Sequence, residues 1–109
     1  EADVLNKAEG YFRQALSLEP ENPAGINNLA YFLIDKDQNI NEGLKIIDTA
    51  LKLRPDNPDF LHTKGWGLYK QGKSIEALEI LQKSWDLKPI YEHVIFLHIR
   101  EVKETIARQ

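Results

Sequence analysis

Three prolines in one register constrain the fold of this chain more than any other feature. Pro20, Pro55 and Pro89 stand 35 and 34 residues apart. A large apolar residue lies eight positions before each proline, and a small residue lies four positions before that one. The six residues are Phe12, Ile47 and Leu81, preceded by Ala8, Gly43 and Ala77. Self-similarity at such a period is typical of repeat architectures, in which supersecondary units stack along one axis.

Each repeat unit has the pattern of two amphipathic helices, most clearly in the second half of the chain. Asn57 is suited to cap a helix, Pro58 to occupy its first position and Gly72 to end it. We expect Ser74 to cap the helix that follows and Pro89 to end it. Residues spaced by three and four positions place one apolar stripe on each helix. The stripes are Leu61, Gly65 and Leu68, then Ala77, Leu78, Leu81, Ser84 and Trp85.

The same spacing predicts six helices and no strand. The helices cover residues 3–18, 23–36, 40–53, 58–71, 74–87 and 90–108. Asn39 and Glu42 form a capping-box pattern at the start of the third. The last helix departs from the repeat, because one side carries a stripe of isoleucine and valine and the other side is charged. Its stripe is Ile95, Ile99, Val102 and Ile106. This pattern is typical of a terminal helix that covers the last repeat.

Together these residues resemble the tetratricopeptide repeat family over nearly all of residues 1–89. The family carries a bulky residue, Leu-Gly and Tyr in the first helix of each repeat, and Ala-x3-Phe and a final Pro in the second. The matching residues are Ile26, Leu29, Ala30, Leu33, Gly43, Ile47, Ala50 and Pro55 in one unit, and Leu61, Gly65, Leu68, Ala77, Leu81 and Pro89 in the next. Lys64 and Ser84 depart from the pattern. Gly65 is expected to face Gly43 or Ala77 across a close helix contact.

The resemblance implies an all-α fold, a right-handed superhelix of antiparallel helix pairs, in one domain. The expected parts are the second helix of a partial repeat (1–20), two full repeats (21–55 and 56–89) and a capping helix (90–109). In this family the first helices line a concave face that binds an extended segment or a helix of another protein. The chain is therefore expected to be a protein-interaction scaffold.

Composition disfavours several other classes of function. The 109 residues are 42% hydrophobic and 28% charged, which suits one packed domain. A net charge of −3 argues against a nucleic-acid partner, and no apolar run approaches the roughly 20 residues of a membrane span. Cysteine and methionine are absent. We therefore expect no thiolate metal site, and we expect a piece of a longer protein whose targeting signals and compartment are not visible.

Catalytic, cofactor and metal patterns are weak. Residues 67–74 match the P-loop expression GxxxxGK(S/T), but the residues before them have a helical period and the repeat already explains Gly72. His93 and His98 point apart on a helix, and His98 is expected to be structural. No sequence context typical of a Ser-His-Asp triad is present. We therefore expect no enzyme, no cofactor and no metal.

A candidate binding surface lies on the two first helices. Tyr31 and Trp66 occupy equivalent positions, away from the apolar stripes. The candidate partner-binding residues on this concave face are Asn27, Asn28, Tyr31, His62, Trp66 and Tyr69. Rings supply contact area and amides satisfy a peptide backbone. Packing of Trp66 on a neighbouring helix is an equal alternative, and an ordinary surface histidine is the favoured interpretation of His62. Trp85 is expected in the core against the last helix.

Self-association is the second functional hypothesis. Residues 3–18 have the pattern of a second helix without its first helix, which leaves its apolar face uncovered. That face carries Leu5, Ala8, Phe12 and Ala15. We expect it to meet another chain, for example in a homodimer, or the helix to fray. The partner is not identified by the sequence, although the lack of a basic set around Asn28 argues against clamping of a C-terminal carboxylate.

Overall fold

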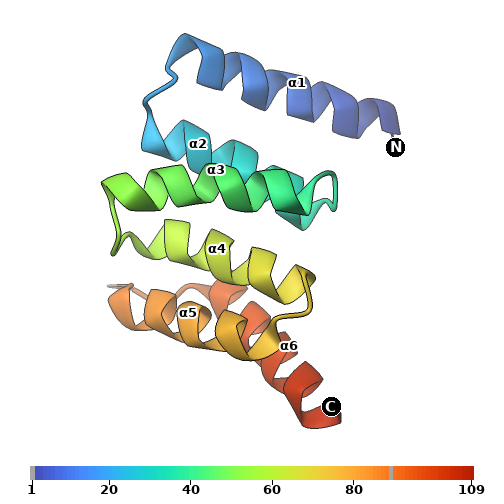
Figure 1. The fold of residues 1–109 in the computed structure, drawn as a ribbon, viewed down its shortest axis with the longest axis vertical. Coiled ribbons are helices and arrows are strands. Elements are labelled where there is room, and N and C mark those ends of the chain that lie inside the picture. The colour runs from blue at the N-terminus through green and yellow to red at the C-terminus, as the bar shows by residue number, and fades with distance from the viewer. Residues whose placement is uncertain (1, 89) are drawn as a thin grey trace.

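The computed structural model describes residues 2–88 and 90–109, and this part of the chain forms six helices. They are α1 (Ala2–Leu18), α2 (Pro23–Asp35), α3 (Ile40–Leu53), α4 (Pro58–Lys70), α5 (Ser74–Leu87) and α6 (His93–Arg108). Consecutive helices run in opposite directions and stack into an elongated solenoid (Figure 1). The all-α prediction is confirmed, since the described residues contain no strand.

The predicted helix bounds hold to within one residue for the first five helices, but α6 begins at His93 instead of residue 90. The reason lies in the segment before it. Glu92 has an extended backbone, with φ −127° and ψ 105°. Tyr91 turns its ring edge-on to Trp85, with centroids 5.4 Å apart, so this aromatic contact competes with an early start of the helix. The expected end of α5 at Pro89 lies outside the described residues, and α5 ends at Leu87.

Asparagine side chains fix the starts of three helices. The Oδ1 atom of Asn22 accepts from the N–H of Ala24 at 3.1 Å, and that of Asn57 accepts from Asp59 at 2.9 Å. Asn39 accepts from the N–H of Glu42 at 3.0 Å, as a capping box requires. The carboxylate of Glu42 instead accepts a hydrogen bond from Arg13 of α1 at 3.0 Å.

The turn between α4 and α5 is a glycine-terminated helix end. Gly72 has φ +87°, and the N–H of Lys73 bonds the carbonyl of Leu68 at 2.9 Å, which is the six-to-one bond of a Schellman motif. Asp37 takes the same place after α2 with φ 54°. The prediction that Ser74 caps α5 is wrong. Lys73 occupies the cap position, and the hydroxyl of Ser74 is buried with no hydrogen-bond partner among residues 2–88 and 90–109.

Small residues bring the two helices of each repeat close together. A Cβ atom added to Gly43 would lie 2.9 Å from the carbonyl oxygen of Ala30, and one added to Gly65 would lie 2.7 Å from the Leu81 side chain. The carbonyl of Ala77 is 3.3 Å from the same point, so the expected approach of Gly65 to Ala77 is confirmed. Each crossing therefore pairs one glycine with one alanine.

The core extends from α2 to α6, and α1 contributes no buried residue. Four side chains of α1 are half-buried against Leu29, Phe32 and Leu33 of α2, so the expectation of an uncovered apolar face on α1 is wrong for most of that face. They are Leu5, Ala8, Phe12 and Leu16. Ala15 is exposed, in contrast to its repeat equivalent Ala50, which is fully buried. Trp85 is half-buried against the cluster between α5 and α6. Among the described residues, no helix has the length and apolar character needed to cross a membrane.

Candidate functional site

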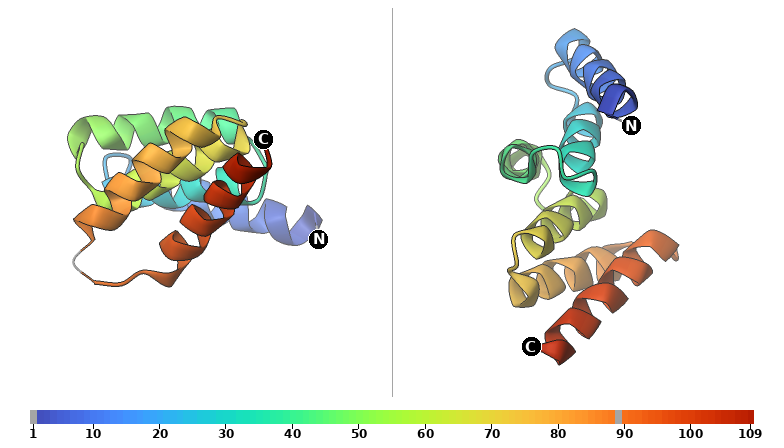
Figure 2. Two further views of the ribbon diagram at one scale, coloured as in Figure 1. Left: turned by 90° about the horizontal axis from the view of Figure 1, so that it is seen from below. Right: turned by 90° about the vertical axis from the view of Figure 1, so that its right-hand side faces the viewer.

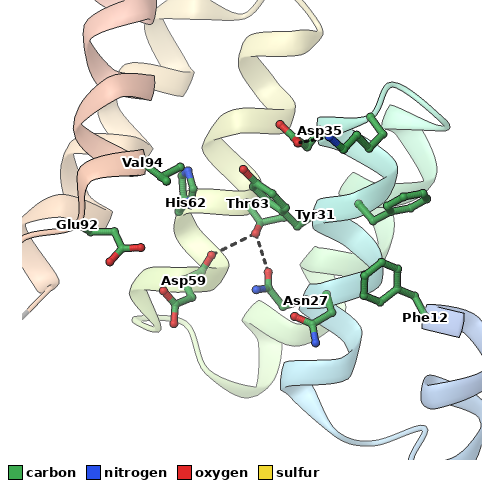
Figure 3. A pocket seen from close by; sticks show the side chains of 12 residues that line it. Phe12, Asn27, Tyr31, Asp35, Asp59, His62, Thr63, Glu92 and Val94 are labelled. Atoms are coloured by element: carbon green, nitrogen blue, oxygen red, sulfur yellow. Dashed lines mark hydrogen bonds and ion pairs between the residues drawn. The ribbon is translucent and has the colours of Figure 1, made fainter. Parts of the chain in front are cut away.

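A pocket of about 490 Å³ lies between the first helices of the two repeats, α2 and α4. Its lining residues are Phe12, Asn27, Asn28, Tyr31, Phe32, Asp35, Lys36, Asp59, His62, Thr63, Glu92 and Val94. Figure 3 shows that α2 and α4 form its two main walls, while Phe12 closes one side from α1 and Glu92 and Val94 close the other. The pocket therefore combines residues from both repeats and from both ends of the chain.

Four of the six candidate residues line this pocket: Asn27, Asn28, Tyr31 and His62. Trp66 and Tyr69 lie further along α4 and outside it. Trp66 is only 5% exposed, because the His98 ring of α6 stacks on its indole with centroids 3.7 Å apart. Its Nε1–H donates to Asp35 at 3.1 Å. Trp66 thus packs on a neighbouring helix, and contact of Trp66 or Tyr69 with a partner stays a prediction.

A hydrogen bond joins the two walls of the pocket, α2 and α4. The hydroxyl of Thr63, on α4, is 2.6 Å from Oδ1 of Asn27 on α2 and 3.2 Å from the carbonyl of Asp59 (Figure 3). Because this contact occupies the oxygen of the Asn27 amide, its NH₂ group is left to donate elsewhere. Asn28 is exposed one position further along. Two amides are therefore available at one wall to pair with an incoming polar group.

Carboxylates outnumber cations around the opening. Asp35, Asp59 and Glu92 line it, against one lysine, Lys36. Asp59 also pairs with Lys88, at 2.6 Å. Asp35 lies 3.9 Å from Nζ of Lys36, so within the described residues Glu92 is the one lining carboxylate without an ion pair, and the excess of negative charge at the opening is about one unit.

Tyr31 supplies the aromatic side of the pocket. Burial, and then the nearby charge of Asp35, raise the pKa of Tyr31 to about 12. The phenol therefore stays protonated over the physiological range and remains a hydrogen-bond donor. Its ring lies beside that of His62, with centroids 5.6 Å apart.

A histidine pair connects the pocket to α6. Nε2 of His62 lies 2.8 Å from Nδ1 of His98, so one ring must donate to the other. Burial, followed by the charge of His98, lowers the pKa of His62 to about 4, and burial also lowers the pKa of His98. Both rings are therefore neutral near pH 7. His62 is half-buried in this contact and is not an ordinary surface histidine.

Several acidic and apolar residues at the rim of the pocket are not among the residues predicted from the sequence. Asp59 precedes His62 by three positions on α4, so helical spacing alone would have placed it on the same side. Glu92 and Val94 reach the pocket only because α6 packs across the end of the stack (Figure 2). No local pattern in the sequence indicates that placement.

A metal site and a phosphate-binding loop both find little support in the described residues. They contain no group of three or more His, Asp or Glu side chains arranged to hold a metal ion. Residues 67–74, which match the P-loop expression, form the end of α4, a turn and the first residue of α5. A phosphate-binding P-loop follows a strand, so the context of this match is different.

Comparison with curated proteins gives two relatives. The chain is 33% identical over 97 residues to a TPR repeat-containing protein of Pseudomonas aeruginosa, an alignment that covers 89% of this chain and 16% of that protein. It is 35% identical over 81 residues to a TPR repeat-containing protein of Methanocaldococcus jannaschii, covering 74% and 14%. The chain therefore spans about a sixth of the length of these relatives or less. No family model matches the sequence.

Comparison with solved structures identifies the same architecture. The TPR domain of P58(IPK) superimposes with a TM-score of 0.77 at 14% identity, covering 96% of this chain and 30% of that one. MamA AMB-1 superimposes with a TM-score of 0.71 at 17% identity, covering 96% and 61%. These likenesses show the fold. With the two curated relatives and the observed stacking of helix pairs, they establish that the chain belongs to the tetratricopeptide repeat family.

Proposed function

We propose that this chain is a scaffold that holds a segment of another protein in the pocket between α2 and α4. The pocket itself carries the proposal. It is open, is about 490 Å³ in volume, and is walled by equivalent helices of two successive repeats. Tetratricopeptide proteins are generally non-enzymatic scaffolds, and we propose the same for this chain.

The chemistry of the lining favours an extended segment with a basic side chain next to an apolar one. Glu92, together with Asp59, which would share its pairing between Lys88 and the ligand, suits a lysine or arginine. Phe12 and Val94, on opposite sides of the opening, suit an apolar side chain. The amides of Asn27 and Asn28 suit the backbone of the segment, whose polar groups need partners when they leave water.

The walls are preorganised by contacts that involve no ligand. The bond between Thr63 and Asn27 sets the spacing of α2 and α4, and the His62–His98 pair fixes α6. A site that is ordered before binding loses less entropy when a partner arrives. The pocket is thus expected to bind without a large rearrangement of its helices.

A charge-reversal experiment tests this proposal. The probe is a fluorescent peptide of alternating lysine and leucine, measured by anisotropy, with a glutamate–leucine peptide as its counterpart. In Asp59→Lys/Glu92→Lys, affinity for the lysine peptide should fall at least about tenfold, since two attractive charges become repulsive. The control is Glu76→Lys/Glu79→Lys on α5, which changes the net charge equally and should leave affinity within about twofold.

Two results would contradict pocket binding. One is unchanged affinity in the Asp59→Lys/Glu92→Lys protein. The other is an equal loss in the α5 control, because that would mean that the peptide responds only to overall charge.

Self-association through α1 is the second candidate function, and one observation favours it. Val4, Tyr11 and Leu18 recur every seven residues, which places them on one side of α1, and Tyr11 is 70% exposed. A second copy could cover this face. Sedimentation equilibrium over a wide concentration range, with Tyr11→Glu as the disrupting variant, would reveal a dimer. A monomer at every concentration would exclude it.

A further inference from the structure

A second pocket lies between α5 and α6, at the C-terminal end of the solenoid. It measures about 310 Å³ and is lined by Gln82, Trp85, Phe96, Ile99, Arg100 and Lys103. None of these residues lines the pocket between α2 and α4. We call this second pocket the end pocket, because α5 and α6, which line it, are the last two helices of the stack (Figure 1).

The position of α6 relative to α4 follows the spacing of the repeat. Asn27 of α2 contacts Thr63 of α4, and His62 of α4 contacts His98 of α6, so both contacts join residues 36 positions apart. α6 therefore meets α4 in the register of a further first helix, although it packs mainly against α5. Its buried residues Ile95, Ile99 and Val102 face back toward α5.

The side of α6 that corresponds to the α5-facing side of α4 carries different residues. α2 and α4 start 35 residues apart, at Pro23 and Pro58. Applied to α6, the same step places Phe96, Arg100 and Lys103 where α4 carries Leu61, Gly65 and Leu68. Gly65 lets α5 approach closely, and Arg100 in its place would prevent such packing. Arg100 and Lys103 therefore give this face of α6 a positive charge that the matching face of α4 lacks.

Aromatic side chains surround the end pocket. Phe96 is 41% exposed, and Trp85 lies 6.3 Å from it, centroid to centroid. Tyr91, also exposed, lies 5.4 Å from Trp85. Exposed rings gathered around a concavity are typical of binding sites, where they supply large apolar contact at low entropic cost.

Two cations complete the wall of the end pocket. Arg100 and Lys103 are one helical turn apart on α6. Within the described part of the chain, neither forms an ion pair with a carboxylate. The lining itself contains no acidic residue. The site thus offers positive charge directly beside an apolar hollow.

We propose that the end pocket binds an acidic segment of a partner protein that presents a large apolar side chain between carboxylates. The apolar side chain fills the space between Trp85 and Phe96, and the carboxylates pair with Arg100 and Lys103. The charge is opposite to that favoured by the pocket between α2 and α4. The chain therefore carries two docking sites with opposite charge preference.

A second copy of this chain fits the end pocket poorly. The exposed face of α1 is apolar at Val4, Tyr11 and Leu18, but helical spacing places Lys7 and Gln14 beside these residues instead of carboxylates. An anionic membrane surface also fits less well, because the site is a hollow and only two cations line it.

The test uses a hexapeptide with Leu-Phe at its centre and two glutamates on each side. Titration into ¹⁵N-labelled protein should shift the indole N–H resonance of Trp85 and leave that of Trp66 in place. In Arg100→Glu/Lys103→Glu, affinity should fall at least about tenfold, and the matching peptide with lysines should now bind better. Lys45→Glu/Lys52→Glu, on the exposed side of α3, changes the net charge equally and should bind within about twofold of the wild type.

Four outcomes would overturn the proposal. The first is wild-type affinity in Arg100→Glu/Lys103→Glu, and the second is an equal loss in the α3 control. The third is co-sedimentation with phosphatidylserine vesicles that the α6 variant abolishes, without any effect of the peptide on Trp85. The fourth is self-association that the same variant abolishes. If the charge reversal lowers the unfolding midpoint, Arg100→Gln/Lys103→Gln takes its place and should still weaken binding several-fold.

Discussion

The two ends of the solenoid both carry an amphipathic helix, but only one of them buries its apolar stripe. On α6, Ile95 and Val102 are closed off from solvent by α5. On α1, the side chains that touch α2 are only half-buried, and Val4, Tyr11 and Leu18 face solvent. Periodicity thus indicates which side of a helix is apolar, whereas the presence of a neighbouring helix decides how far that side is buried.

The attachment of α1 is correspondingly weak. Its main polar link is Arg13, which pairs with Glu42 of α3 at 3.0 Å and with Glu9 at 2.9 Å. Such exposed ion pairs each contribute about 0.2–1 kcal/mol. Burial of apolar area is the larger stabilising term, and α1 alone among the six described helices has no fully buried residue. Perturbations at the two ends should therefore differ in size.

The largest difference is expected between Leu81→Ala on α5 and Phe12→Ala on α1. Leu81 is fully buried, so its truncation leaves a cavity and should lower the free energy of unfolding by about 3–5 kcal/mol. Phe12 is half-exposed, so Phe12→Ala removes less buried apolar area. It should lower the free energy of unfolding by about 1–2 kcal/mol. Urea denaturation measures both. Equal losses would mean that α1 belongs to the same cooperative core.

Acidification should lower the free energy of unfolding through the contact between His62 on α4 and His98 on α6. The pKa of His62 is about 4 in the folded chain, below its ordinary value of 6.5, so the unfolded chain binds more protons between these values. The stability due to the neutral ring is complete above pH 6.5 and is lost as the pH falls toward 4. The loss should reach about 3 kcal/mol.

Neighbouring charges modulate this effect without reversing it. His98 and Lys88 lower the pKa of His62, while Asp59 and Asp35 raise it. Urea titrations at pH 7 and pH 4.5 should show a smaller acid loss in His62→Gln than in the wild type. His93→Gln, at an exposed position, serves as the control and should keep the full acid loss. An unchanged pH dependence in His62→Gln would count against the pair.

Glycine-to-alanine substitutions should change stability in opposite directions at the α4–α5 crossing and on α1. A Cβ at Gly65 would meet Leu81 at 2.7 Å, so Gly65→Ala should destabilise the protein by about 1–3 kcal/mol. At Gly10, on α1, nothing lies within 4 Å of that Cβ. Gly10→Ala should therefore stabilise the helix by about 0.5–1 kcal/mol, because alanine restricts the unfolded chain. Thermal denaturation measures both: the midpoint should fall in Gly65→Ala and rise in Gly10→Ala. Shifts of the same sign would contradict the prediction.

Most of the fold can be predicted from the sequence, because the repeat pattern sets the positions of the helices. The prolines, the asparagine caps and the small residues at helix crossings locate the first five helices to within one residue. The start of α6 escapes prediction because it depends on Tyr91 reaching Trp85, and the cap of α5 escapes because Ser74 turns inward. Both depend on tertiary contacts that no local pattern contains.

The candidate site was predictable only in part. Equivalent positions on successive first helices identify Asn27, Tyr31 and His62 as neighbours, and all three line the pocket. Trp66 shares their side of the helix but is covered by His98. Its burial follows from the place of α6, which the sequence does not reveal.

Amide hydrogen exchange of the free protein tests the central claim most directly: α2 and α4 form a stable platform for the pocket, and α1 borders it loosely. Amides in the middle of α2 and α4 should open only with global unfolding, and their exchange should therefore report the full free energy of unfolding. Amides of α1 should exchange through a local opening that requires at least about 1–2 kcal/mol less. Equal protection of α1 and α4 would contradict the claim.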